Sequence, residues 1–280
     1  MKSVRRTLLF LLLPAILLAH DTWLIPNAFR VAPGTPVEIR LATSEAFPSS
    51  EAAAAPERIA RFTLRAASGS RSLQDYRVEG TFLVARAILD QPGHNVLVAE
   101  TRPRAFVLEP KIFNQYLEEE GLEAILAERA RKGQRESPGR ERYRKIAKTI
   151  LCVGPADDAL YARTEGLWLE IIPEQSPCGL RAGDTLSVRV LFEGQPLAGA
   201  HLGAGYEGVA GHKYPIWIVT DPQGRATLRL DRSGVWFVRT LHMVPAAQDA
   251  EADWHSAFST LTFEVQPSRS EQGEVRGTKR

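Results

Sequence analysis

The sequence has little of what marks a membrane-spanning protein. Its one long apolar run covers residues 8–18 of the 280-residue chain and follows three basic residues. That run is shorter than the roughly 20 residues that a transmembrane helix needs, and it ends at the small residue Ala19. The pattern predicts a signal peptide over residues 1–19 and a periplasmic or secreted protein without a membrane span after cleavage. An uncleaved anchor is the alternative.

The chain also lacks a charge excess of either sign. It carries 35 Lys and Arg against 33 Asp and Glu, a formal net charge of +2. Because residues 1–19 hold three basic and no acidic residues, the mature chain is left with a net charge of about −1. A protein that binds nucleic acid needs a strongly basic surface to neutralise phosphates, so nucleic acid is excluded as a partner.

Cysteine is scarce, with only Cys152 and Cys178. In an oxidising compartment, an even number of cysteines favours a disulfide. The alternative use, as two thiolate metal ligands, is disfavoured because the pair lacks CxxC spacing and oxidation competes with it. We therefore predict a disulfide between Cys152 and Cys178.

The chain contains no recognisable catalytic motif. No serine lies in a GxSxG nucleophile motif, and none of the six histidines has HxH, HxxxH or HExxH spacing. Imidazole is nevertheless the commonest nitrogen ligand for zinc, copper and nickel. The sequence therefore predicts a protein that is not an enzyme, and any metal site must be assembled by the fold.

Short apolar segments that are typical of β-strands occupy both ends of the chain. Turn residues separate them, as in an antiparallel sandwich, and one turn, TDPQGR at residues 220–225, is a well-formed hairpin signal. The predicted strands are residues 37–42, 61–67, 81–89, 95–100, 167–172, 185–192, 216–220, 226–230, 235–241 and 258–265.

The middle of the chain differs, because residues 110–151 are rich in Glu, Arg, Leu and Ala, with apolar residues at helical spacing. We predict a mainly β protein with two immunoglobulin-like β-sandwich domains, residues 20–109 and 165–266. A helical connector of two or three helices over residues 110–151 is expected to join them. Residues 267–280 are predicted to form a disordered tail.

Several stretches, taken in order, resemble one protein family. They are AHDTWLIP after the leader, FNQYLEEEGL with RERYRKIAK in the middle, GQPLAGA, and TDPQGRATLRLDRSGVWFVRTLHMV with DWHSAFSTLTFEV near the end. Together they resemble the DUF4198 family, which is grouped with NikM, the periplasmic component of nickel transport. The resemblance implies an exported β-rich protein that handles divalent metal ions. Its expected partner is a membrane metal transporter or another envelope protein.

The resemblance also implies a role for His20. In the nickel-transport relatives the extreme N-terminus holds the metal, and only His20 matches that position. This chain departs from them because it lacks an N-terminal Met-His with a membrane helix behind it. From the residues alone, cleavage after Ala19 puts a free amine and an imidazole on His20, which can close one chelate ring. Such nitrogen ligands suit nickel(II) or copper(II) better than calcium or magnesium.

His242 and His255 are the candidates for a further metal ligand. His242 follows the predicted strand at 235–241, where it fits equally well as a core histidine. His255 follows Trp254, and Asp253 is near enough in sequence to fix its tautomer, although a surface histidine is the simpler interpretation. For the remaining histidines we predict structural positions: an exposed turn for His94, a core position for His201 and a glycine-flanked loop for His212.

The leading hypothesis is an exported, non-enzymatic, metal-binding accessory protein for the uptake or handling of nickel or another divalent transition metal. Copper is the rival ion on ligand chemistry. The alternative is a metal-free immunoglobulin-like module that binds a protein or glycan partner in the cell envelope. A third hypothesis, a copper oxidase built on a terminal histidine, needs a second histidine facing His20.

Overall fold

The computed structural model describes residues 20–211 and 213–269. The predicted signal peptide therefore lies outside the described residues, as do most of the predicted tail and His212. Among the described residues, no helix combines the length and the apolar character needed to cross a membrane.

The described chain is mainly β. Its elements, in order, are β1 (Asp21–Pro26), β2 (Arg30–Val31), β3 (Thr35–Ser44), β4 (Ile59–Ala66), β5 (Gly69–Ser72), β6 (Tyr76–Glu79), β7 (Phe82–Leu89), β8 (Gly93–Thr101), β9 (Arg104–Leu108), α1 (Pro110–Glu119), α2 (Glu123–Arg131), β10 (Gly139–Val153), β11 (Leu169–Pro173), β12 (Thr185–Phe192), β13 (Gln195–Pro196), β14 (His201–Tyr206), β15 (Ile216–Val219), β16 (Arg225–Arg229), β17 (Gly234–Pro245) and β18 (Trp254–Val265).

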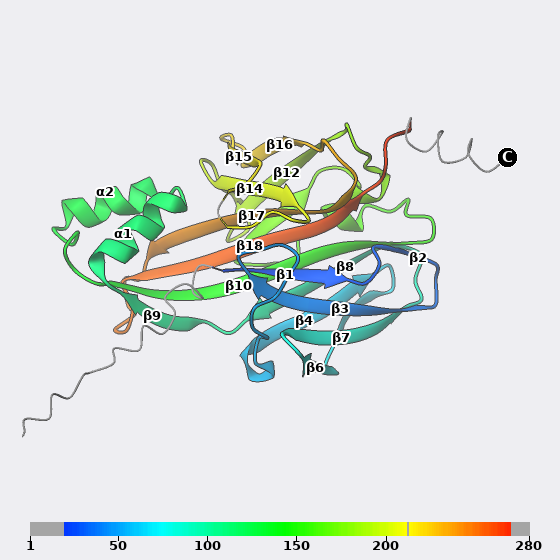
Figure 1. The fold of residues 1–280 in the computed structure, drawn as a ribbon, viewed down its shortest axis with the longest axis horizontal. Helices are drawn as coiled ribbons and strands as arrows, with labels where there is room; N and C mark the ends of the chain where they lie inside the picture. The colour runs from blue at the N-terminus through cyan, green and yellow to red at the C-terminus, as the bar shows by residue number, and fades with distance from the viewer. Residues whose placement is uncertain (1–19, 212, 270–280) are drawn as a thin grey trace, which may run out of the picture.

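One ten-stranded sheet runs through both halves of the chain. Its order is β15-β14-β17-β18-β10-β8-β4-β5, and β2 and β9 also pair with β10. Two four-stranded sheets pack against it: β1-β3-β7-β6 and a sheet of β11, β12, β13 and β16. Figure 1 shows the long strands β10 and β18 between these two smaller sheets, with α1 and α2 at one end.

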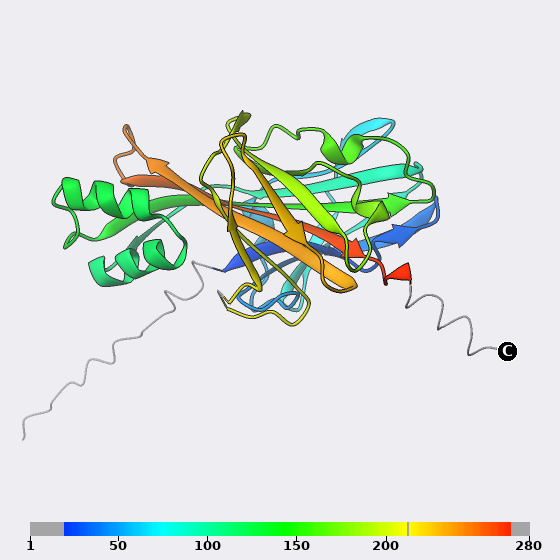
Figure 2. The ribbon, with the colours of Figure 1, turned by 90° about the horizontal axis from the view of Figure 1, so that it is seen from above.

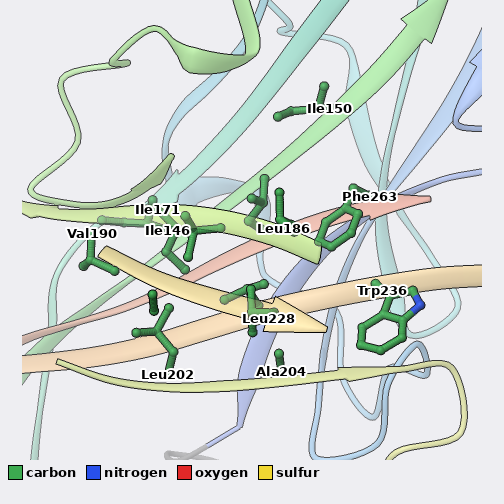
Figure 3. Packing of buried hydrophobic residues seen from close by; sticks show 14 of the residues in the cluster. Ile146, Ile150, Ile171, Leu186, Val190, Leu202, Ala204, Leu228, Trp236 and Phe263 are labelled. Carbon is green, nitrogen blue, oxygen red and sulfur yellow. The ribbon is translucent and has the colours of Figure 1, made fainter. Parts of the chain in front are cut away.

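The two smaller sheets cover opposite faces of the large sheet, and β10 shows why. Its side chains alternate between faces. Ile146 and Ile150 join one core with β11, β12, β14, β16, β17 and β18, whereas Ala147 and Leu151 join the other core with β1, β3, β4, β7 and β8. Figure 3 shows the first of these cores, and Figure 2 shows the layers from above.

The structure corrects the predicted connector over residues 110–151. Two helices are present, but residues 139–153 form the longest strand, β10, which pairs with β18 of the C-terminal half and β8 of the N-terminal half. Arg and Lys in this segment suggested a helix, yet Arg140 and Arg142 meet carboxylates of the 249–253 loop across the sheet. The two halves therefore share a sheet and are not two sandwiches joined by a helical segment.

The two helices cover one end of the large sheet. α1 begins with Pro110 in its first turn and buries Phe113, Tyr116 and Leu117 at helical spacing. These side chains form a third core with residues of β10, β17 and β18. The chain leaves α1 through Gly121, whose φ of +69° is a conformation that favours glycine.

The remaining sequence predictions agree well with the strands. Each predicted segment overlaps a strand of the structure. The 220–225 turn is also confirmed, because Asp221 Oδ1 accepts hydrogen bonds from the backbone N–H groups of Gln223 and Arg225, both at 2.8 Å. The predicted disulfide between Cys152 and Cys178 is present, with 5.7 Å between the Cα atoms.

Candidate functional site

The candidate site is centred on His20, which directly precedes β1. β1 pairs with β3 so that Asp21 lies opposite Ser44, the last residue of β3. Beyond β3 the chain turns back, and Ser44 Oγ donates a hydrogen bond to Glu51 Oε1 at 3.0 Å. Glu45 and Glu51 are thereby both held at the end of β3 that faces His20.

The imidazole ring of His20 is enclosed between these two carboxylates. Its Nε2 is 3.3 Å from Glu45 Oε1, and its Nδ1 is 3.7 Å from Glu51 Oε2. The side chain of His20 has no exposed surface, yet neither ring nitrogen has a hydrogen-bond partner among the described residues. An unpartnered buried polar atom is costly, so two on one ring point to a site for a bound group.

The environment of His20 favours its neutral form. Burial lowers the pKa of His20, because it disfavours the charged imidazolium, and the charge of Lys145 acts in the same direction. The carboxylates of Glu51 and Glu45 raise the pKa but do not overcome the effect of burial. The ring is therefore in the neutral form that binds metal ions.

A buried ionic network adjoins His20 through Asp21. Arg239 of β17 is fully buried and donates to Asp21 Oδ2 at 3.0 Å and to Glu120 Oε1 at 3.2 Å. Burial alone lowers the pKa of Arg239, but Asp21 and Glu120 raise it well above its usual value. The single positive charge of this guanidinium is shared by Asp21 and Glu120, and both carboxylates are directed to it. Glu45 and Glu51 are the carboxylates that face His20.

The structure does not bring the predicted ligands His242 and His255 to His20. Strands β17 and β18 pair in a register that puts both histidines on the same face of the large sheet. β1 lies against the opposite face, where the hydroxyls of Thr260 and Thr262 donate to its carbonyl groups. The body of the sheet thus separates the two histidines from His20.

These two histidines have other neighbours. His255 Nε2 is 2.8 Å from Asp249 Oδ2, and the ring of His242 packs edge-on against Phe192 with 4.5 Å between centroids. Asp253, expected to orient His255, pairs instead with Arg140. Within residues 20–211 and 213–269, no three His, Cys, Asp or Glu side chains are arranged to hold a metal ion. A site at His20 therefore depends on a ligand other than these side chains.

The prediction for His94 is wrong, because its ring is fully buried. Its Nε2 is 2.6 Å from Ser176 Oγ, and its Nδ1 is 3.1 Å from Asp158 Oδ1. Asp158, His94 and Ser176 are thus connected in the order of a hydrolytic triad. Ser176 Oγ, however, also accepts a hydrogen bond from the N–H of Cys178 and so caps the short turn that carries the disulfide. This network joins that turn to β8.

Sequence reasoning missed Glu51, Lys145 and Arg239 as neighbours of His20. Glu51 lies in a loop without periodicity, so nothing local links it to His20. Lys145 and Arg239 stand in strands whose alternation directs them inward, and that alternation is the one signal that identifies them as buried charges.

The comparisons with known proteins identify the family. The family described as "Domain of unknown function (DUF4198)" matches residues 17–244. The match covers most of the chain, so the chain belongs to this family, and the resemblance seen in the sequence is confirmed. The further relation to the nickel-transport component stays a prediction. No curated protein matches the chain.

Three of the solved structures that match the chain show distant similarity. The D0-D1 domain of intimin is 10% identical with a TM-score of 0.22, and the alignment covers 86% of this chain and 96% of that one. The ectodomain of mouse nectin-like molecule 4 (Ig1-Ig3) is 11% identical with a TM-score of 0.20, covering 89% and 65%. The three N-terminal domains of the bacteriophage RB49 outer capsid protein Hoc are 9% identical with a TM-score of 0.18, covering 87% and 59%. Scores this low support no functional argument.

Proposed function

We propose that the protein is an exported, non-enzymatic metal-binding protein whose ion is held at His20, the first residue of the mature chain. The observation that carries this proposal is the buried imidazole of His20, with two unpartnered nitrogens and a carboxylate beside each. An ion supplies the partner that Nδ1 lacks among the described residues.

The donor set fits a transition metal. Signal cleavage after Ala19 frees the α-amine of His20, which chelates together with Nδ1 of the same residue. Glu51 Oε2 lies on the Nδ1 side at 3.7 Å. Two ligands at about 2.0–2.2 Å from one ion are roughly 3–3.6 Å apart, so a small shift of the exposed Glu51 side chain suffices. Two nitrogens and one oxygen suit nickel(II) and copper(II).

Glu45 has a different role in this proposal. It lies on the Nε2 side, 3.3 Å away, and a small shift of its exposed side chain would let the carboxylate accept the ring proton when the ion is bound. A carboxylate partner of this kind fixes the tautomer and raises the basicity of the ligating nitrogen. With the proton on Nε2, the lone pair of Nδ1 is free for the ion.

The proposed role is the uptake or handling of nickel, with copper as the rival ion, and transfer to a membrane transporter or another envelope protein. Nickel is preferred because of the family resemblance, and export is supported by the disulfide, which forms in oxidising compartments.

The test is a calorimetric titration with nickel and copper of protein that begins at His20. We compare it with His20→Ala and with a chain carrying one extra alanine before His20, which keeps the imidazole but moves the amine. We expect both changes to weaken nickel binding at least about tenfold, while the control His255→Ala binds as the wild type does. Equal affinity in His20→Ala, or a mature protein that begins at another residue, contradicts the proposal.

A further inference from the structure

A cavity lies next to His20, and its charged lining residues are basic, whereas the charged neighbours of the His20 ring are carboxylates. It is a cavity of about 290 Å³ between β1, β3, β9, β10 and the chain at residues 52–55. Three of its lining residues are basic, Arg58, Arg104 and Lys145, and none is acidic. The rest of the lining consists of hydroxyl-bearing side chains and four consecutive alanines.

Lys145 is the buried cation of this cavity. It is only 6% exposed, and its ammonium group makes one hydrogen bond among the described residues, to the carbonyl oxygen of His20 at 2.5 Å. Its ammonium forms no ion pair with a carboxylate of the described residues, and the negative charge nearest in effect is that of Asp21, which already binds Arg239. An ammonium has three N–H donors, so two donors of Lys145 are left without a partner among the described residues. Unused donors on a buried cation are costly, and an anion from outside the chain would accept from them.

The two arginines add to the same positive field. The guanidinium of Arg58 lies 5.9 Å from the centre of the Tyr143 ring, and the ammonium of Lys145 lies 5.8 Å from the same ring. Arg104 is opposite Tyr143 in the pairing of β9 with β10. Among the described residues neither arginine has an acidic partner, whereas the nearby Arg140 and Arg142 are both paired with aspartate.

We propose that this cavity binds a small organic polycarboxylate. Guanidinium groups bind carboxylates in a bidentate geometry. The hydroxyls of Thr22 and Thr43 bond to each other at 3.0 Å, which leaves one hydroxyl proton of the pair as a further donor. The alanines at 52–55 offer an apolar wall to the carbon skeleton, which an inorganic anion lacks. The volume equals that of about ten water molecules, so it fits a small di- or tricarboxylic acid.

The position of the cavity relates the acid to the ion. Lys145 joins the cavity to the backbone of His20, and the alanine segment directly follows Glu51. A bound polycarboxylate therefore lies beside the proposed ligands and supplies oxygen donors to the ion, a step that rests on the proposed function. Binding of the acid itself does not need the metal.

The experiment is a titration of metal-free mature protein with citrate at low ionic strength, with inorganic phosphate as the comparison. We expect citrate to bind at least about tenfold more tightly than phosphate. Arg58→Gln and Arg104→Gln are expected to weaken citrate binding by about three- to tenfold each, since each removes one charged donor. Arg102→Gln is the matched control, because Arg102 is exposed, close in sequence and not part of the cavity lining.

Two further variants separate the outcomes. Lys145→Met is expected to abolish citrate binding, and thermal unfolding followed by circular dichroism shows whether it folds. His20→Ala is expected to keep citrate binding, so failure of the metal proposal and failure of this one are seen separately. The inference is overturned by absence of citrate binding, by equal affinity for phosphate, or by wild-type affinity in both arginine variants.

Discussion

Nζ of Lys148 on β10 lies 3.0 Å from Oε1 of Glu170 on β11, and both side chains are 2% exposed. The pair joins the large sheet to one of the smaller sheets inside their shared core. Glu170 also accepts the backbone N–H of Glu165 at 2.9 Å, and Glu165 in turn binds Arg61 of β4. One buried pair therefore links three segments that are distant in the sequence.

Breaking only one side of this pair is expected to be costly. Lys148→Met leaves the carboxylate of Glu170 buried without its counter-ion, and we expect a loss of about 3–5 kcal/mol in the free energy of unfolding. The double variant Lys148→Met with Glu170→Gln removes both charges and is expected to lose less than Lys148→Met alone. Urea unfolding measures both values. Arg225→Gln, which breaks the exposed pair with Glu174, is the control and should cost at most about 1 kcal/mol.

Glu141 gives the protein a specific pH dependence of stability. It is fully buried, and burial raises its pKa to about 8, although hydrogen bonds from Ser256 and Tyr116 act in the opposite direction. Between pH 4.5, near the ordinary value, and pH 8, the folded chain keeps a proton that the unfolded chain releases. Stability therefore falls as pH rises through this window, by up to about 1.4 kcal/mol per pH unit.

The variant Glu141→Gln tests this effect. It cannot ionise, yet its amide oxygen still accepts the two hydrogen bonds. We expect its stability to be about equal to that of wild type near pH 5 and clearly greater at pH 8. Unfolding by urea across this pH range gives the difference between the two proteins, in which other titrating groups cancel. Parallel stability curves for the two proteins would show that Glu141 ionises normally.

The disulfide is expected to contribute strongly to stability. Cys152 and Cys178 are separated by 26 residues, and closing a loop of that length stabilises by about 3.5 kcal/mol in the chain-entropy model. Replacing both cysteines with alanine should lower the free energy of unfolding by about that amount. The replacement should also abolish any further effect of a reducing agent, which is expected to destabilise only the wild type.

The fold could be predicted where local pattern and tertiary environment agree. The strand at 185–192 alternates exposed and buried residues, and the strand at 235–241 is strongly apolar. The turn at 220–225 contains Asp221, whose side chain accepts a hydrogen bond from the turn backbone. β10 could not be assigned in this way. Its N-terminal half alternates half-buried arginines with fully buried side chains, and Arg140 and Arg142 pair with carboxylates about 110 residues later in the chain. A prediction from neighbouring residues cannot include such distant ion pairs, so the composition of the segment indicates a helix instead.

The same limit applies to the candidate site. His20 could be proposed from the sequence because it directly follows the predicted signal peptide. Glu51, Lys145 and Arg239 come from different elements, and only the packing of β1 against β3, β10 and β18 brings them near His20. The histidines His242 and His255 were chosen by residue type, and the strand register places them on the wrong face.

Glu45 and Glu51 are expected to differ in how they affect metal binding. Glu51→Ala removes a proposed ligand, whereas Glu45→Ala removes the group that fixes the His20 tautomer, which typically costs about ten- to a hundredfold in affinity. We therefore expect both variants to bind nickel more weakly, and only Glu45→Ala to change the ring tautomer in the metal-free protein. Nitrogen-15 NMR of the imidazole measures the tautomer, and calorimetry measures the affinity.

Glu45→Gln should restore part of the affinity, because its amide oxygen still accepts the Nε2 proton. Asp75→Ala, at an exposed position on another loop, serves as the control. Wild-type affinity in Glu45→Ala, or an unchanged tautomer, would remove Glu45 from this role.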